Sequence, residues 1–360
     1  MDRNFSPWAY WRLLQDRTPD PPPVPDDPAA ALGWAAEVRT RLAGLIGADP
    51  EPVDPQLELG GPIEEPHGSR RRVVFDSEAG MSVPAWLVEP AAPRPGAPAL
   101  LVLHGHGLDK DGVCGVGPGP FGTLDYGRRL AAEGFTVLAP DLRGFGERTD
   151  GMLPAPPAAA GPVAGTASPA GADDIVEGIL RHQADCGWDL VCALLAGTTP
   201  MARNLWDLRR SLDVLGTIAP GNPERFGVVG WSYGAALAVL LAAVDDRVAA
   251  AVASGFVSSW RAAHRVPWNL CGRQVFPGLL GDLEHRDVAA LVAPRALLVE
   301  SAQDDLLAPA DEAERTVAEI RRAYGLLGAD PAVVEHDVVP GGHDWNGRSV
   351  VAFLDDHLTG

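Results

Sequence analysis

The sequence is poor in residue types whose abundance would point to several classes of protein. It has four cysteines in 360 residues, Cys114, Cys186, Cys192 and Cys271, and none belongs to a CxxC pair. A disulfide scaffold is therefore not expected, and a reducing cytoplasm is the default location. No apolar run reaches the roughly 18 uncharged residues that a membrane span requires. The first residues also lack a basic region followed by an apolar stretch. We therefore expect no membrane partner and no signal peptide.

Positive charge is also scarce. The chain has 29 Lys and Arg against 48 Asp and Glu, a formal net charge of −19, and Lys110 is its only lysine. Binding to nucleic acid requires a basic surface, so a nucleic-acid partner is not expected. An acidic surface favours solubility and indicates no further function. The length suits one large α/β domain or two smaller ones.

Short apolar runs alternate with helical patterns from about residue 56 onward. The predicted strands are an antiparallel pair at 72–75 and 83–88, followed by 99–103, 136–139, 226–229, 248–253, 296–300 and 332–338. The predicted helices are 126–133, a longer region near 173–216, 233–243, 311–326 and 347–357. Such alternation implies a mainly parallel sheet covered by helices on both faces, which is the α/β class.

Residues 1–50 read as a helical extension of a catalytic domain at 51–360. A proline-rich linker at 19–25 precedes Asp27 and Pro28, which suit an N-cap and a first helical position, and Gly47 can end the helix. Apolar residues recur there at helical spacing, namely Leu32, Ala35, Val38, Leu42 and Leu45. A second segment, about 151–172, is rich in Ala, Pro and Gly, and we expect a mobile loop. The loop could act as a lid, but we favour a neutral insertion.

The strongest motif lies between the strand at 226–229 and the helix at 233–243. It reads Gly230-Trp231-Ser232-Tyr233-Gly234, a G-x-S-x-G sequence at a strand-to-helix turn. A nucleophile elbow needs small residues on both sides of the serine because its strained backbone passes close to its neighbours. The motif therefore predicts Ser232 as a nucleophile and the backbone N–H of Tyr233 as an oxyanion-hole donor.

A second motif, His104-Gly105-His106-Gly107, follows the apolar run at 99–103. The loop after this strand supplies the second oxyanion-hole donor in proteins with such an elbow, which we assign to the N–H of His106. The alternative is zinc, because His-x-His after a strand also occurs in zinc hydrolases. That alternative needs further ligands and leaves the elbow unexplained, so no metal is expected.

The acid and the base of a catalytic triad follow in the C-terminal third. Asp304 and Asp305 come after the strand at 296–300, and neighbouring side chains on extended backbone point in opposite directions, so only one should reach the base. Asp305 is favoured because it lies four residues before Pro309, a spacing usual for this acid in the α/β-hydrolases that these motifs resemble. His343 follows the last strand in a glycine-rich loop. The order Ser232, Asp305, His343 is that of α/β-hydrolases.

Further stretches match one branch of that superfamily across about residues 70 to 350. They include Asp125-Tyr126-Gly127, Asp141-Leu142-Arg143-Gly144-Phe145-Gly146-Glu147-Arg148, Trp206-Asp207, Ser254-Gly255-Phe256, Pro277-Gly278-Leu279-Leu280, Ala293-Pro294-Arg295, Glu300-Ser301 and Gly341-Gly342-His343. The chain thereby resembles the dienelactone-hydrolase-like proteins that include acetylxylan esterases. The resemblance implies an α/β-hydrolase fold with a small cap, and ester hydrolysis without a cofactor. Ala302, and the bulky Trp231 and Tyr233, depart from the usual pattern.

The substrate is less well indicated than the chemistry. We predict a small-molecule carboxylic ester, with acyl transfer, lactone or peptide cleavage, or hydrolysis of a carbon–carbon bond as alternatives. A non-catalytic binding protein is a third hypothesis, which the complete triad argues against. Residues about 255–290 are the predicted cap, and we assign Trp231, Trp260, Trp268 and Phe276 to substrate binding, with simple packing as an equal alternative. The oligomeric state is open, and a homodimer is one alternative.

Overall fold

A computed structural model describes residues 4–94, 96, 99–117, 124–149, 185–220, 225–266 and 269–358. Trp268 and the predicted loop at 151–172 lie outside these residues. Within the described ranges, no helix has the length and apolarity needed to cross a membrane.

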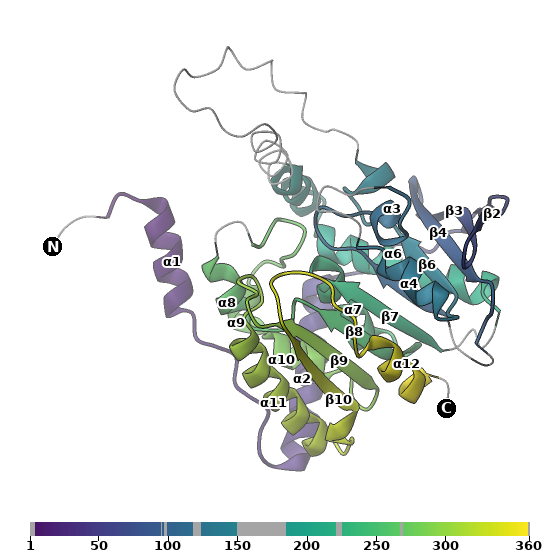
Figure 1. Cartoon of the computed structure of the whole chain (residues 1–360). Coiled ribbons are helices and arrows are strands. Elements are labelled where there is room, and N and C mark those ends of the chain that lie inside the picture. The colour runs from purple at the N-terminus through teal and green to yellow at the C-terminus, as the bar shows by residue number, and fades with distance from the viewer. Residues whose placement is uncertain are drawn as a thin grey trace, which may run out of the picture.

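The centre of the molecule is a ten-stranded sheet (Figure 1). The strands are β1 (Glu58–Leu59), β2 (Ile63–Glu65), β3 (Gly68–Glu78), β4 (Met81–Pro90), β5 (Leu100–Leu103), β6 (Val137–Pro140), β7 (Phe226–Trp231), β8 (Val248–Ser254), β9 (Ala296–Ala302) and β10 (Val334–Val339). Their order is β1-β3-β4-β6-β5-β7-β8-β9-β10, with β2 paired to β3. From β6 to β10 all neighbours are parallel, whereas β1 to β4 pair antiparallel. The predicted mainly parallel sheet is confirmed.

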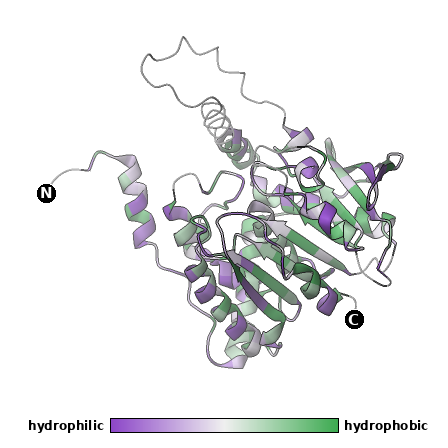
Figure 2. Cartoon of the chain, in the orientation of Figure 1, coloured by the Kyte–Doolittle hydropathy of each residue, from purple (hydrophilic) through white to green (hydrophobic). Residues whose placement is uncertain are grey.

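Helices cover both faces of this sheet. They are α1 (Pro7–Arg17), α2 (Pro28–Ile46), α3 (Lys110–Val113), α4 (Tyr126–Ala132), α6 (Pro200–Ile218), α7 (Tyr233–Val244), α8 (Trp260–Arg265), α9 (Leu279–Asp282), α10 (His285–Ala290), α11 (Ala310–Leu326) and α12 (Val350–Leu358), and residues 185–195 are also helical. Side chains of a strand alternate between two cores: Leu101 and Leu103 join α2, α6, α7, α10 and α11, whereas Leu100 and Val102 join α4 and α12. Figure 2 shows these central strands as strongly hydrophobic.

The second N-terminal helix belongs to the main body, and α1 is joined to the cap, where Arg261 of α8 donates hydrogen bonds to the carbonyl oxygens of Gln15 at 3.0 Å and Thr18 at 2.8 Å. Asp27 caps α2 by accepting a 2.8 Å hydrogen bond from the Ala30 N–H, and Gly47 ends the helix with φ 78°, as the sequence predicts. The predicted apolar face is confirmed at Ala35, Val38 and Leu42, which are buried, and at Leu45, which packs against the core; it is wrong at Leu32, which is 60% exposed while Ala31 is buried in its place. The helix α1 buries none of its residues.

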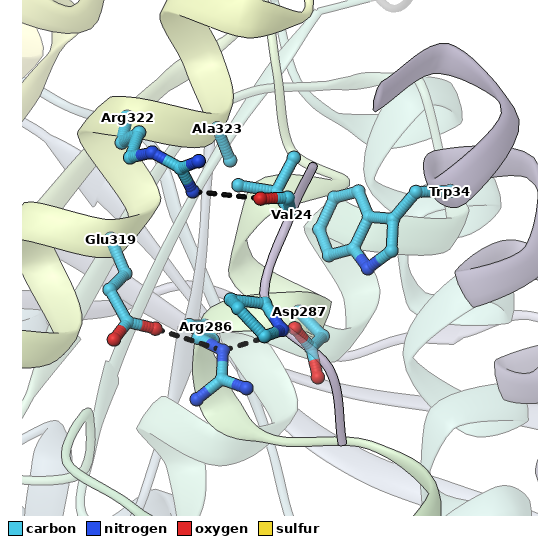
Figure 3. Close-up of a pocket in the computed structure, with 8 residues that line it drawn as sticks. Val24, Trp34, Arg286, Asp287, Glu319, Arg322 and Ala323 are labelled. Atoms are coloured by element: carbon cyan, nitrogen blue, oxygen red, sulfur yellow. Dashed lines mark hydrogen bonds and ion pairs between the residues drawn. The ribbon is translucent and has the colours of Figure 1, made fainter. Parts of the chain in front are cut away.

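The linker before α2 is fixed against α11. Arg322 donates a 2.8 Å hydrogen bond to the Val24 carbonyl, and Val24 lies beside the ring of Trp34 (Figure 3). Arg286 pairs with Glu319 at 2.9 Å in the same region. The space left among these side chains is about 10 Å³, which is room for no more than one water molecule. This contact therefore anchors the N-terminal segment and is too small to hold a substrate.

Candidate active site

The chain makes a sharp turn at Ser232, between the end of β7 and the start of α7. Ser232 has φ 55° and ψ −118°, a conformation that costs a non-glycine residue about 1–3 kcal/mol. A Cβ on Gly230 would lie 2.2 Å from the Gly234 carbonyl oxygen, and one on Gly234 would lie 2.2 Å from the Leu103 carbonyl oxygen. The turn therefore requires both glycines, as the G-x-S-x-G motif predicts.

Loops after β9 and β10 bring the predicted acid and base to this turn. His343 lies between the other two residues, with Nε2 at 2.9 Å from Ser232 Oγ and Nδ1 at 2.8 Å from Asp305 Oδ2. The other carboxylate oxygen of Asp305 accepts hydrogen bonds from the N–H groups of Leu307 (2.8 Å) and Ala308 (3.0 Å). The predicted residues thus form one connected chain of hydrogen bonds.

The choice between the two adjacent aspartates follows from burial as well as from distance. Asp305 is 3% exposed and faces His343, whereas Asp304 is exposed. The backbone N–H of Asp304 donates to the Gly341 carbonyl at 2.8 Å, which fastens this loop to the loop that carries His343. The structure therefore places Asp305, and not Asp304, against His343.

Glu300 is a supporting residue to which sequence reasoning assigned no role. It lies near the end of β9, is 2% exposed, and accepts hydrogen bonds from Ser254 Oγ at 2.6 Å and from the Gly347 N–H at 2.7 Å. Burial raises the pKa of this carboxyl group. Glu300 therefore connects β8 and β9 to the segment just after His343. In the sequence, the feature that could have indicated this role is an acidic residue inside an apolar strand.

The predicted oxyanion hole lies where the β5 loop meets α7. A Cβ on Gly105 would be 3.0 Å from the Ser232 Cβ and 2.6 Å from the Trp231 ring, so the β5 loop touches the turn directly. His106 is the next residue, and Tyr233 opens α7, where backbone N–H groups have no partner within the helix. Tyr233 is therefore next to Ser232 in the chain, and His106 follows a residue that contacts Ser232 in space. Their role as oxyanion-hole donors stays a prediction.

The two histidines of the HGxG motif have different surroundings. His104 is fully buried; its Nε2 accepts from the Leu142 N–H at 3.0 Å and its Nδ1 is 3.0 Å from the Gly105 carbonyl oxygen. Burial lowers the pKa of His104, so the ring is neutral and holds the loop in shape. The His106 ring instead lies 3.0 Å from Cys271 Sγ. The two rings therefore do not share one metal site.

The Asp141–Arg148 stretch is held in place by hydrogen bonds and ion pairs. Asp141 accepts from the N–H groups of Lys110 and Glu147, both at 2.9 Å, and pairs with the buried Lys110 ammonium at 3.1 Å. A Cβ on Gly146 would lie 2.3 Å from the Asp141 carboxylate, which explains the glycine. Arg143 pairs with Asp207 of α6 at 2.6 Å. These matched motif residues therefore have a structural role.

Of the described residues predicted to bind substrate, Trp231 lies beside His343. Its ring centroid is 5.1 Å from that of His343. Trp260 and Phe276 line a cavity of about 410 Å³ between α1 and the cap, which Trp11 also lines, and no triad residue is among its lining side chains. The structure therefore brings Trp231 to the site and places Trp260 and Phe276 around a separate cavity, while Trp268 lies outside the described residues.

The α/β hydrolase fold family matches residues 98–284, which include β5, the Ser232 turn and most of the predicted cap. The chain belongs to this family. Its predicted fold class is confirmed by this match together with the sheet order and the helices on both faces.

Proteins similar to this chain include "Putative hydrolase YtaP" of Bacillus subtilis (strain 168). The two are 24% identical over 325 residues, which cover 84% of this chain and 97% of YtaP. A solved structure of a "putative acetyl xylan esterase" from Bacteroides fragilis has a TM-score of 0.70 and 17% identity, over 93% of this chain and 82% of that one. A glucuronoyl esterase from Solibacter usitatus has a TM-score of 0.61 and 15% identity, over 90% of this chain and 92% of that one. The expected likeness to acetylxylan esterases is thus found at the level of the fold.

Proposed function

We propose that this protein hydrolyses carboxylic esters of small molecules, with Ser232, His343 and Asp305 as its catalytic triad. The observation that carries the proposal is the position of His343, hydrogen-bonded to Ser232 Oγ at 2.9 Å and to Asp305 at 2.8 Å. Ester chemistry is supported by the similar structures, which include acetyl xylan esterases and a glucuronoyl esterase.

In the proposed mechanism, His343 Nε2 takes the proton of Ser232 as its oxygen attacks the ester carbonyl carbon. Asp305 accepts a hydrogen bond from Nδ1–H, which fixes the imidazole tautomer and stabilises the imidazolium. The negative charge that develops on the carbonyl oxygen is held by the N–H groups of Tyr233 and His106, where loss of one donor typically costs about 100- to 1000-fold in rate.

Collapse of the tetrahedral intermediate breaks the bond to the alcohol, which leaves with the proton from His343. Water, activated by the same imidazole, then attacks the acyl group on Ser232 and releases the carboxylic acid. No redox change occurs, and Ser232 recovers its proton. The triad residues of this chain account for each proton transfer.

A panel of p-nitrophenyl esters with acyl chains of increasing length tests the proposal, with Ser232→Ala as the matched inactive variant. We expect wild-type turnover of at least one short ester and its loss in the variant. If no ester is hydrolysed although Ser232 reacts with a fluorophosphonate, the ester proposal is wrong and the triad serves another acyl or carbon–carbon cleavage. If Ser232 does not react either, the triad itself is inactive.

A further inference from the structure

Three segments that are far apart in the sequence place sulfur and nitrogen atoms together beside the β5 loop. His106 lies in that loop, Cys186 in the helix at 185–195, and Cys271 in the cap after α8. His106 Nε2 and the two Sγ atoms all lie within 4.8 Å of one another, with 3.0 Å between His106 Nε2 and Cys271 Sγ. Across the part of the chain that the structure describes, no other group of three or more His, Cys, Asp or Glu is close enough to hold a metal.

The donor set and its spacing suit a thiophilic divalent cation. Zinc binds imidazole nitrogen at about 2.0–2.1 Å and thiolate sulfur at about 2.3 Å, so tetrahedral ligands lie roughly 3.5 Å apart. Both cysteines are shielded from solvent, Cys186 at 0% and Cys271 at 5% exposure. Two thiolates and one imidazole would neutralise a dication and leave a fourth position for water, and thiolate and imidazole ligands favour zinc over magnesium or calcium.

The surroundings hold both sulfur atoms in place. Arg273 donates from its backbone N–H to Cys271 Sγ at 3.3 Å and from its guanidinium to Cys186 Sγ at 3.2 Å. The Arg273 charge is itself balanced by Asp189 at 2.8 Å. Hydrogen bonds to metal-bound thiolates are a usual outer shell, and they orient the ligands before the ion arrives.

Close packing of the backbone brings the two cysteines together. A Cβ on Gly272 would lie 2.4 Å from the Cys186 carbonyl oxygen, so only glycine allows the cap to approach the helix at 185–195 this closely. The Tyr233 hydroxyl donates to the Arg273 carbonyl at 2.9 Å, which fixes the same part of the cap to the start of α7. The cluster therefore sits in a built and rigid part of the fold.

We propose that His106, Cys186 and Cys271 bind one Zn²⁺ ion per chain. Binding releases the thiol protons of the two cysteines, so the affinity falls as the pH is lowered. The bound ion ties the β5 loop, the helix at 185–195 and the cap together. This proposal does not depend on ester hydrolysis, because it rests on the donor set alone.

Metal uptake by reduced, untagged protein tests the proposal. Elemental analysis is expected to find one equivalent of zinc, and Co²⁺ added to chelator-treated protein should give the visible bands of a tetrahedral site with a near-ultraviolet thiolate-to-cobalt band. Cys186→Ser and Cys271→Ser should lose that band. Cys192→Ser is the matched control and should keep it, because Cys192 is exposed and outside the cluster.

Wild-type uptake is measured first, because a variant of a buried cysteine can fail to fold; far-UV circular dichroism identifies such a variant. Folded, reduced wild-type protein that takes up neither Zn²⁺ nor Co²⁺ would overturn the proposal. So would a thiolate-to-cobalt band that survives in folded Cys271→Ser. Isolation of the chain with a Cys186–Cys271 disulfide, and no metal uptake after its reduction, would show that the pair is a redox couple instead.

Discussion

Replacing Asp305 by Asn should disable the base while leaving the loop intact. Asp305 Oδ1 accepts hydrogen bonds from two backbone N–H groups, those of Leu307 and Ala308. An asparagine must therefore keep its carbonyl oxygen at that position and place its NH₂ group toward His343 Nδ1. Two donors cannot face each other, so Nδ1 must become the acceptor and the ring proton moves to Nε2. Nε2 then cannot accept the proton of Ser232.

The expected loss in kcat is about 10⁴-fold, the size that the same change causes in a serine-protease triad, or about 5.5 kcal/mol of barrier. Steady-state hydrolysis of the best p-nitrophenyl ester measures it. Asp304→Asn is the matched control, because Asp304 is exposed and adjacent; as a surface change it should alter stability by no more than about 0.5 kcal/mol and leave kcat intact. A loss in kcat of only a few fold in D305N, or a larger loss in D304N, would refute the assignment.

Three further predictions concern stability. Burial raises the pKa of Glu284 from 4.5 to about 7, so the folded state keeps a proton that the unfolded chain releases, and stability falls as pH rises through that window. Glu284→Gln removes this loss. In urea unfolding, the free energy of unfolding of the variant minus that of wild type should be about 3 kcal/mol larger at pH 8 than at pH 4.5. Tyr233→Phe should cost about 1–3 kcal/mol by leaving the buried Arg273 carbonyl without its 2.9 Å hydroxyl donor, measured by denaturant unfolding; no change would show that water replaces the donor. Gly234→Ala should destabilise by about 1–3 kcal/mol or more, because its Cβ meets backbone at 2.2 Å, whereas Gly44→Ala in α2 meets nothing within 4 Å and should stabilise the protein. Thermal unfolding compares the two, and equal effects would contradict the packing argument.

Sequence patterns were sufficient for the features that depend on local chemistry. Strands buried on both faces appear as continuous apolar runs, and the Ser232 turn needs glycine on both sides for steric reasons, so both could be read from the chain. The order of Ser232, Asp305 and His343 also fixes which strand end carries each residue, and parallel strands place those ends at one edge of the sheet.

The remaining features depend on contacts between distant segments. Cys186 and Cys271 show no pair spacing, because the helix and the cap that carry them meet only in the folded chain. The role of Glu300 likewise depends on its hydrogen bonds to Ser254 and Gly347, which are distant from it in the sequence. Leu32 was placed inward because an amphipathic pattern fixes a helix face only to within about one residue, and neighbouring elements decide the rest.

The most direct test of the central claim is to locate the residue that reacts with a fluorophosphonate. We expect one adduct per chain, found by peptide mass spectrometry on Ser232, together with loss of ester hydrolysis at the same rate as labelling. Labelling should be strongly slowed in His343→Ala, because Ser232 Oγ loses the imidazole that lies 2.9 Å away. An active enzyme whose label falls on another residue, or an active Ser232→Ala variant, would contradict the assignment of Ser232 as the nucleophile.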